Sequence, residues 1–266
     1  MKLMSDKTEL SVIMPCYNEH ERIHDAIMSI LEQSYRDFEF IIVDDCSTDE
    51  SPVIIKKMMA EDPRIIYLRN DENMGVAASL NHGLSRARGE FIARMDADDT
   101  CEKDRLYKQL IYMKEHPECV LCGTYGDVYT GEGTNIQGYV KGDLKKALVR
   151  NNFLIHTSVV FPRVISGWKV RYSQEKGFED YDLWIELSKH GEFHVIPEIL
   201  VHRNDINNVS HKKAWEGLNK HLIYKRLRKY QLKAGKATGH MIYALYCSSI
   251  TAIKELLHNI KEGKLR

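Results

Sequence analysis

The 266-residue sequence predicts an α/β fold, a mostly parallel sheet flanked by helices, and three features support that prediction. Apolar segments alternate with helical patterns four times within about the first 115 residues. Each apolar segment ends in polar or acidic residues, and the alternation gives way to a glycine-rich pattern after residue 120. Near-continuous apolar strands joined by helices form parallel sheets that are covered on both faces.

The four predicted strands lie at residues 10–17, 38–45, 64–68 and 89–95, and a predicted helix follows each of them. The first helix is expected to begin at Asn18, a good capping residue, because apolar residues then recur at helical spacing up to Leu31. Crossovers between parallel strands are right-handed, so the carboxyl ends of all four strands lie at one edge of the sheet. Open α/β sheets bind their ligands at that edge.

Three carboxylates follow the fourth predicted strand within four residues, at Asp96, Asp98 and Asp99. Carboxylate oxygens are suitable ligands for Mg²⁺ or Mn²⁺, and Mg²⁺ is usually held by one or two carboxylates together with substrate phosphates. Taken alone, the cluster fits a metal site and a solvated acidic turn equally well. No GxGxxG or GxxxxGK[ST] motif follows a predicted strand, which argues against a dinucleotide site or a P-loop.

The second half of the chain predicts a smaller, mixed part. Residues 123–142 are rich in glycine, which indicates irregular or antiparallel structure, and a strand predicted at residues 154–161 would place His156 and Ser158 on the same face. A helix is predicted after Gly177, with Trp184 on its buried face and Asp180 in its first turn. Acidic residues are common at helix starts, so simple capping is the favoured interpretation of Asp180 taken alone.

The formal net charge of zero hides an uneven distribution. Residues 212–266 hold 13 Lys and Arg against 3 Asp and Glu, which leaves 25 against 35 in residues 1–211. The acidic part and the basic tail are predicted to be separate regions, and the tail to form helices at about 213–232 and 238–262. A basic amphipathic helix fits contact with an anionic membrane surface and a solvated face packed on the body equally well. The acidic strand-end edge argues against nucleic acid as a partner.

Cysteine usage and hydropathy predict a soluble protein with reduced thiols. The six cysteines have no regular spacing, and Cys119 and Cys122 lack the second pair or the histidines that would complete a zinc site. The longest uncharged apolar run, residues 241–253, is too short to span a bilayer. No signal peptide is recognisable at the N-terminus, so a cytoplasmic location is expected, with contact at the inner face of the membrane through the tail.

Six groups of residues resemble the motifs of family 2 glycosyltransferases in order and spacing. They are SVIMPCYN at 11–18, VDDCSTD at 43–49, NMG at 73–75 with NHG at 81–83, ARGEFI at 87–92, MDADD at 95–99 and EDYDLW at 179–184. The resemblance covers about residues 9–205 and implies a GT-A fold with a Rossmann-like half. The expected domains are a glycosyltransferase domain at 1–211, with a nucleotide-sugar-binding half at about 9–118 and an acceptor half at about 119–211, and a basic helical extension at 212–266.

The resemblance also implies which residues bind the donor and catalyse transfer. Those implied for the nucleotide sugar are Pro15, Tyr17, Glu19, Asp44, Asp45, Asp96, Ala97 and Asp98. Asp45 would accept a hydrogen bond from the uracil imide, and Asp180 would be the catalytic base. Asp98 would bind a Mn²⁺ or Mg²⁺ cofactor that bridges the diphosphate, with Asp96, Asp99 and His202 as further candidate ligands.

The acceptor side is implied less completely. The implied acceptor residues are His156, Glu179 and Trp184, and His156 fits a hydrogen-bonded core histidine equally well. Residues 201–205 depart from the family pattern, with His202 where relatives often have Tyr and Asp205 where they have His. A third contact to the metal or phosphate would therefore come from His202 or His211. Arg94 and Arg105 are expected to have structural roles beside nearby acids.

The implied activity is inverting transfer of a hexose or hexosamine from a UDP-sugar to a glycan or lipid-linked saccharide, in cell-surface polysaccharide biosynthesis. Such a displacement needs a neutralised leaving group and an activated acceptor hydroxyl, which a metal and a carboxylate base supply. A sugar-nucleotide nucleotidyltransferase is the first alternative, but its glycine-rich basic loop is absent near the first strand. A non-catalytic sugar-nucleotide-binding protein is the second, and the joint presence of Asp96, Asp98 and Asp180 argues against it.

Overall fold

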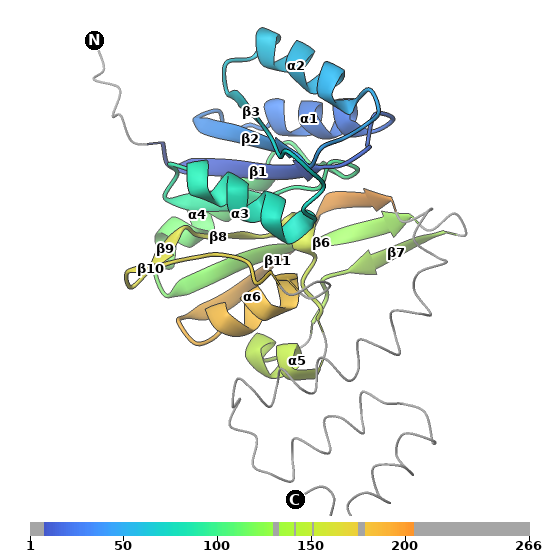
Figure 1. The fold of residues 1–266 in the computed structure, drawn as a ribbon. Helices are drawn as coiled ribbons and strands as arrows, with labels where there is room; N and C mark the ends of the chain where they lie inside the picture. Colours follow the sequence, from blue (N-terminus) through green and yellow to red (C-terminus); the bar gives the residue numbers. More distant parts are fainter. Residues whose placement is uncertain (1–7, 130–132, 141, 151, 175–178, 205–266) are drawn as a thin grey trace, which may run out of the picture. The chain divides into compact units, whose positions relative to one another are not determined.

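A computed structural model describes residues 8–129, 133–140, 142–150, 152–174 and 179–204 (Figure 1). The chain divides into two compact units, residues 1–140 with 153–205 and residues 141–152 with 206–266. In the second unit the described part contains one short helix, α5 (Leu144–Arg150). The predicted tail helices and the predicted boundary at residue 211 lie outside the described residues and stay predictions. None of the helices in the described ranges is long and apolar enough to cross a membrane.

The first unit is built on a nine-stranded sheet in the order β3-β2-β1-β4-β8-β6-β11-β5, with β7 paired to β6. Its strands are β1 (Leu10–Cys16), β2 (Phe38–Asp44), β3 (Ile65–Arg69), β4 (Phe91–Arg94), β5 (Thr100–Cys101), β6 (Cys119–Tyr129), β7 (Thr134–Gln137), β8 (Val160–Pro162) and β11 (Glu192–Asn204). The first four strands are parallel, whereas β8 is antiparallel to both β4 and β6. The prediction of a parallel half followed by a mixed part is therefore confirmed.

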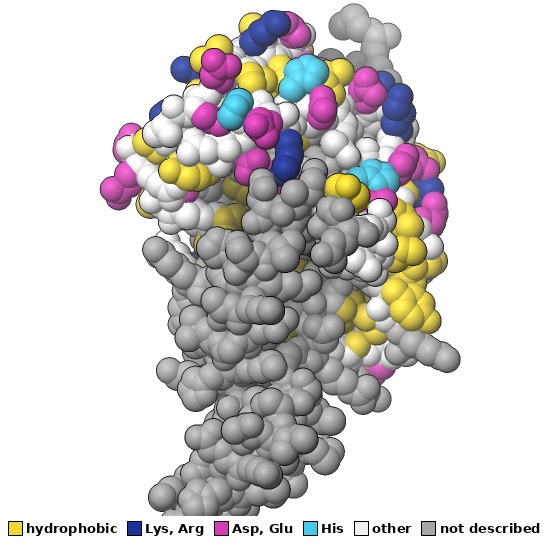
Figure 2. Space-filling model, turned by 90° about the vertical axis from the view of Figure 1, so that its right-hand side faces the viewer, with side chains coloured by type: hydrophobic (Ala, Val, Ile, Leu, Met, Phe, Trp, Pro, Cys, Tyr) yellow, Lys and Arg dark blue, Asp and Glu magenta, His cyan; other side chains and the backbone are white. Residues whose placement is uncertain are grey.

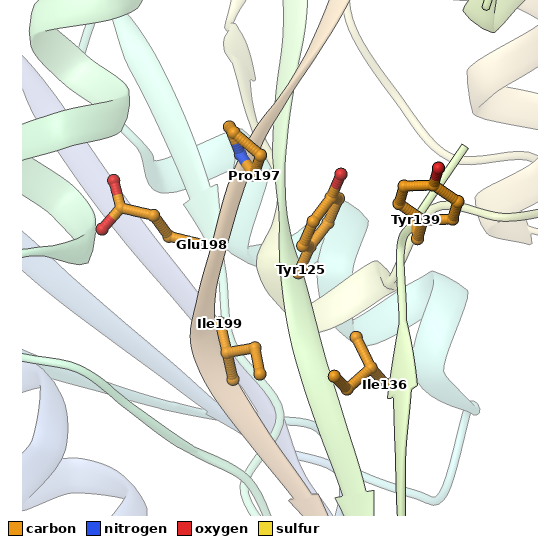
Figure 3. A pocket seen from close by; sticks show the side chains of 6 residues that line it. All are labelled: Tyr125, Ile136, Tyr139, Pro197, Glu198 and Ile199. Atoms are coloured by element: carbon orange, nitrogen blue, oxygen red, sulfur yellow. The ribbon is translucent and has the colours of Figure 1, made fainter. Parts of the chain in front are cut away.

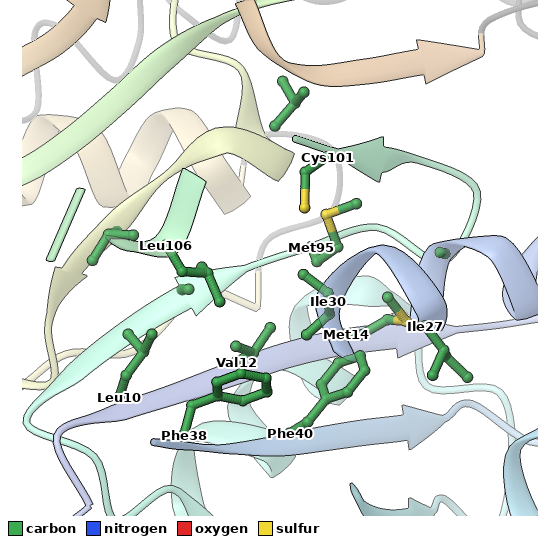
Figure 4. Packing of buried hydrophobic residues seen from close by; sticks show 14 of the residues in the cluster. Leu10, Val12, Met14, Ile27, Ile30, Phe38, Phe40, Met95, Cys101 and Leu106 are labelled. Carbon is green, nitrogen blue, oxygen red and sulfur yellow. The ribbon is translucent and has the colours of Figure 1, made fainter. Parts of the chain in front are cut away.

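Helices cover both faces of the parallel half. They are α1 (Ile23–Leu31), α2 (Ser51–Glu61), α3 (Val76–Arg86) and α4 (Arg105–Glu115), and α6 (Glu179–Leu187) follows in the mixed part. Alternate residues of β1 and β2 form the main core with α1, as Figure 4 shows for Val12, Phe40 and Ile27. Side chains alternate between the faces of a strand, so Ile13 points to the opposite face. Helix α3 packs there, and a Cβ atom at Gly83 would lie only 2.6 Å from Ile13 Cγ2.

The predicted strand at residues 154–161 is wrong in its first half. Residues His156–Ser158 form a 3₁₀ turn, and extended structure begins only at β8. The Ser158 hydroxyl and amide both donate to the Ile155 carbonyl, each at 2.9 Å. Short hydroxyl side chains offer the backbone such local partners in competition with a ladder. His156 and Ser158 consequently do not share a strand face.

Candidate active site

A cavity of about 160 Å³ opens at the edge of the sheet where the parallel strands end. Its lining comes from four separate segments and consists of Pro15, Cys16, Tyr17, Glu19, Asp45, Val76, Ser79, Asp96, Ala97 and Asp98. All residues predicted to bind a nucleotide sugar line it except Asp44. Figure 2 looks onto the side to which β1 and β2 point in Figure 1, and acidic and histidine side chains gather over its upper part.

The loops after β1 and β2 are hydrogen-bonded to each other beside this cavity. Asn18 has a φ of 55° and Cys46 a φ of 64°, a left-handed conformation that is uncommon outside glycine. The Asn18 side-chain oxygen accepts from the Thr48 amide at 2.8 Å, and the Glu19 amide donates to Ser51 Oγ at 2.9 Å. Because residue 18 is held in this loop, helix α1 begins at Ile23 rather than at Asn18 as predicted.

Asp45 is buried in the wall of the cavity, where its carboxylate accepts several hydrogen bonds. Its Oδ1 receives Asn70 Nδ2 at 2.7 Å and the Met74 amide at 3.0 Å, and its Oδ2 receives the Gly75 amide at 2.7 Å. Burial raises the pKa of Asp45, but these hydrogen bonds and one from the Ser79 side chain outweigh burial and hold the pKa below its ordinary value. Asp45 is therefore an ionised acceptor in the cavity wall.

Asp44 lies beneath the cavity and not in its wall. Its carboxylate accepts from the Ser47 amide at 2.8 Å, from Tyr67 Oη at 2.7 Å and from Arg69 Nη1 at 2.5 Å. These contacts fix the turn that follows β2, so Asp44 supports the loop that carries Asp45.

Ligand atoms of Asp96, Asp98 and Asp99 lie within 4.8 Å of one another, which among the described residues makes them the candidate group for a metal ion. Buried Arg94 forms an ion pair with the Asp96 carboxylate, while Thr157 Oγ1 accepts from the Asp96 amide at 2.9 Å. Arg105 lies below and donates from Nη2 to the Arg94 carbonyl at 2.8 Å. The two arginines thus hold the end of β4, in agreement with the structural roles expected for them.

His202 contacts two carboxylates that do not belong to the aspartate cluster. Its Nδ1 lies 2.8 Å from Asp127 Oδ1 and its Nε2 lies 3.0 Å from Glu102 Oε1. Burial lowers the pKa of His202, but the two carboxylates outweigh burial and raise it. The next residue, Arg203, approaches the cluster instead, with its Nε 3.7 Å from Asp99 Oδ2. The structure therefore does not bring His202 to the three aspartates, and Asp205 and His211 lie outside the described residues.

The residues predicted for the base and the acceptor meet on helix α6 and the turn before β8. Asp180 lies in the first turn of α6, where its Oδ1 accepts from the Tyr181 amide at 2.6 Å. Trp184 follows one turn later and packs edge-on against His156, with 5.7 Å between the ring centroids. Burial and the charges of Arg94 and Arg203 lower the pKa of His156, so the imidazole is neutral.

Comparison with known proteins identifies the family. The model of glycosyl transferase family 2 matches residues 11–163, more than half of the chain. The chain belongs to glycosyl transferase family 2. TuaG of Bacillus subtilis, which is named for teichuronic acid biosynthesis, is 31% identical over 218 residues, covering 80% of this chain and 86% of TuaG. The segment matched by the family model contains Asp45, Asp96 and Asp98 but ends before Asp180.

Two solved structures show the fold of this family 2 glycosyltransferase. S. aureus TarS in complex with UDP-GlcNAc has a TM-score of 0.70 at 19% identity, covering 90% of this chain and 71% of the TarS chain. The mannosyltransferase PcManGT from Pyrobaculum calidifontis, in complex with GDP-Man and Mn²⁺, has a TM-score of 0.67 at 17% identity, covering 97% and 80%. The predicted GT-A fold is confirmed.

The glycosyltransferase has a second, larger cavity of about 690 Å³ (Figure 3). It is lined by Tyr125, Ile136, Tyr139, Pro197, Glu198 and Ile199. Its single carboxylate, Glu198, pairs with Lys108 Nζ at 2.5 Å. The lining is otherwise uncharged, whereas the smaller cavity gathers Glu19, Asp45, Asp96 and Asp98, and the smaller cavity is therefore the candidate active site.

Sequence reasoning missed several residues of the site. Val76 and Ser79 line the cavity from the first turn of α3, and Ser79 Oγ also accepts from Asn70 Nδ2 at 2.9 Å. Gly75, directly before them, could have indicated this helix start. It has a φ of 87°, a conformation that favours glycine, and it precedes α3 directly beside Asp45. Tyr172, whose hydroxyl lies 3.1 Å from His156 Nε2, was missed as well, and nothing in its local sequence distinguishes it.

Proposed function

We propose that this glycosyltransferase moves a hexose or hexosamine from a UDP-sugar to a saccharide acceptor, with inversion at the anomeric carbon, in the synthesis of a surface polysaccharide. The observation that carries the proposal is the joint lining of one cavity by Tyr17, Asp45 and the acids Asp96 and Asp98. Tyr17 offers an aromatic ring and Asp45 a carboxylate for the nucleotide base. Asp96 and Asp98 offer carboxylates at the place proposed for the diphosphate and its cation. The names of TuaG and of the TarS complex with UDP-GlcNAc support the product class and the nucleotide.

The donor would lie along the cavity with its base at the β1–β2 side. Tyr17 is 44% exposed and available to stack on a base, since aromatic side chains bind flat rings by stacking. The Asp45 carboxylate, which lines the cavity, would accept a hydrogen bond from the imide N–H of uracil. The diphosphate would then reach the aspartates at the end of β4.

The acidic cluster suits a divalent cation. Asp99 is buried, and no hydrogen bond reaches its Oδ2, which has the Arg203 guanidinium 3.7 Å away as an ion-pair partner. Asp98 and Asp99 would hold Mn²⁺ or Mg²⁺, with Asp96 as a further ligand, and the PcManGT complex contains Mn²⁺. When bound, the ion supplies Lewis-acid stabilisation of the departing diphosphate.

Binding of the ion should depend on pH. Burial and the neighbouring Asp96 and Asp98 charges raise the pKa of Asp99 to about 8. A raised pKa means that Asp99 carries a proton below pH 8, and the cation must displace it. Mn²⁺ affinity is therefore expected to fall as pH decreases from 8 to 6, by up to roughly tenfold per pH unit for one proton. Calorimetry in two buffers of different ionisation enthalpy measures the released proton, and identical heats in both would contradict the prediction.

Asp180 would act as general base on the opposite side of the sugar from the diphosphate. As the acceptor oxygen bonds to the anomeric carbon, Asp180 takes its proton, and the bond from that carbon to the diphosphate breaks in the same step. A single in-line displacement inverts the configuration, so an α-linked donor gives a β-glycoside and free UDP. The proton leaves Asp180 for water after the product departs.

A lipid-linked acceptor would place the enzyme at the cytoplasmic face of the membrane. The excess of Lys and Arg in residues 212–266 supports that location, because each such charge near an anionic surface contributes about 1 kcal/mol.

A donor screen followed by product analysis tests the proposal. Thermal shifts with UDP-, GDP- and dTDP-sugars, each with and without Mn²⁺, should single out a UDP-sugar that stabilises the protein more when Mn²⁺ is present. Incubation of that donor with saccharide acceptors should then release UDP. Stabilisation by a GDP-sugar alone would overturn the nucleotide assignment, and release of pyrophosphate would indicate nucleotidyl transfer. Binding without turnover of any donor would indicate a non-catalytic protein.

A further inference from the structure

We propose that Asn81 and Tyr172 are positioning residues that hold the catalytic-base helix α6 against the donor side of the site. The inference rests on the proposed function, in which Asp180 is the base. It is carried by a chain of contacts that joins α3, which borders the donor cavity, to α6, which bears Asp180.

The first link is a clamp between α3 and the segment after β10 (Trp168–Lys169). Asn81 Nδ2 donates to the Tyr172 carbonyl at 2.9 Å, and the Tyr172 amide donates to Asn81 Oδ1 at 2.8 Å. One side chain thus satisfies both backbone groups of a residue 91 positions away in the sequence. Backbone groups away from water need such partners, so the clamp fixes where Tyr172 lies relative to α3.

The second link runs from Tyr172 to α6. Tyr172 is 3% exposed, and its hydroxyl lies 3.1 Å from His156 Nε2. The imidazole also makes a T-shaped contact with Trp184, with 5.7 Å between the ring centroids. Trp184 and Asp180 are four residues apart on α6 and therefore lie on the same side of that helix. The Tyr172–His156–Trp184 contacts thus connect the clamp to the side of α6 that bears Asp180.

The Tyr172 hydroxyl keeps its proton in this arrangement. Burial raises the pKa of the hydroxyl, and the charges of Asp180, Glu179 and Asp96 raise it further, while Arg94 lowers it. The hydroxyl can therefore donate to Nε2 of the neutral His156, 3.1 Å away.

Helix α3, which carries Asn81, also begins next to Asp45 in the wall of the donor cavity. Gly75, directly before α3, donates to Asp45, and Asn81 lies in the middle of the same rigid element. If the contact between Asn81 and Tyr172 were lost, the first turn of α3 would stay in place, whereas α6 with the catalytic base Asp180 would shift. Loss of the clamp should thus slow transfer without weakening donor binding, because a misplaced catalytic group affects the reaction step.

Tyr172→Phe and Asn81→Ala test this, with Ser85→Ala on the exposed side of α3 as the matched control. Tyr172→Phe removes one hydrogen bond and keeps the ring, so kcat should fall roughly fivefold to tenfold. Asn81→Ala removes two bonds, and kcat should fall roughly tenfold to a hundredfold. The Kd of the UDP-sugar, measured by calorimetry, should stay within about twofold of the parent value for all three variants.

The outcomes separate this inference from the proposed function. If the parent protein transfers no sugar from any UDP donor, the proposed function fails. If it transfers and Tyr172→Phe keeps the parent kcat, or loses donor affinity at unchanged kcat, the positioning role is overturned. Thermal unfolding of each variant is measured first, and if Asn81→Ala does not fold, the folded Tyr172→Phe variant decides alone.

Discussion

Asp180→Asn is expected to lower the rate of transfer by roughly 10²- to 10⁴-fold, the range that general base catalysis contributes. Asparagine keeps the size of the side chain and an oxygen that can accept from the Tyr181 amide. It cannot take a proton from the acceptor hydroxyl at neutral pH. The Kd of the UDP-sugar should remain within about twofold of the parent value, because Asp180 does not line the donor cavity. Initial rates of UDP release and calorimetric donor titrations measure the two quantities.

Two further variants test whether the loss of transfer is specific to Asp180. Glu186→Gln removes a carboxylate from the same helix, where it pairs with Lys189 at 2.6 Å, and should leave the rate unchanged. Glu179→Gln tests the neighbouring acid in the first turn of α6. Normal transfer by Asp180→Asn together with loss of transfer in Glu179→Gln would move the base assignment to Glu179. Loss of donor binding in Asp180→Asn would instead place Asp180 on the donor side.

The position of the proposed donor cavity could be predicted from the sequence. Its residues lie close to strand ends in the sequence, and the geometry of a parallel sheet brings those strand ends together. Tyr17, Asp45 and Asp96 each follow an apolar strand, and right-handed crossovers bring the carboxyl ends of parallel strands to one edge. The register Cys16↔Asp44 shows that β1 and β2 end at the same level, which places their loops in contact. Strand order predicts where these polar residues meet, and the role of each residue toward a nucleotide sugar is what the family resemblance implies.

The acceptor side could not be predicted in the same way, because long-range packing places its residues. Tyr172 depends on Asn81, which no local pattern connects to it. His202 lies opposite Asp127 because β6 and β11 pair in a register with two bulges near Ile199, and sequence periodicity does not reveal bulges. The family pattern suggested His202 as a metal ligand, and the pairing of β11 with β6 and β5 instead provides it with two carboxylate partners.

Asp98→Asn is expected to lower Mn²⁺ affinity by at least roughly a hundredfold, since even outer-shell partners of a metal site cost up to that much. Asp98 lines the proposed donor cavity together with Asp96, and its Oδ2 lies 4.0 Å from Arg22 Nη1. An asparagine there carries no charge and offers one oxygen, so the cation would be held by the remaining aspartates alone. Transfer should fall in parallel with metal occupancy.

Asp98→Asn can distinguish a role of Asp98 in metal binding from a role in nucleotide binding. In the proposed binding mode Tyr17 and Asp45 bind the nucleoside end of the donor, so UDP should still stabilise Asp98→Asn in thermal unfolding, but added Mn²⁺ should no longer increase the shift. Asp25→Asn, which removes an exposed carboxylate from α1, should behave like the parent protein. Retention of the full Mn²⁺-dependent shift in Asp98→Asn would contradict the assignment of Asp98 as a ligand. Loss of UDP binding without Mn²⁺ would show that Asp98 contacts the nucleotide itself.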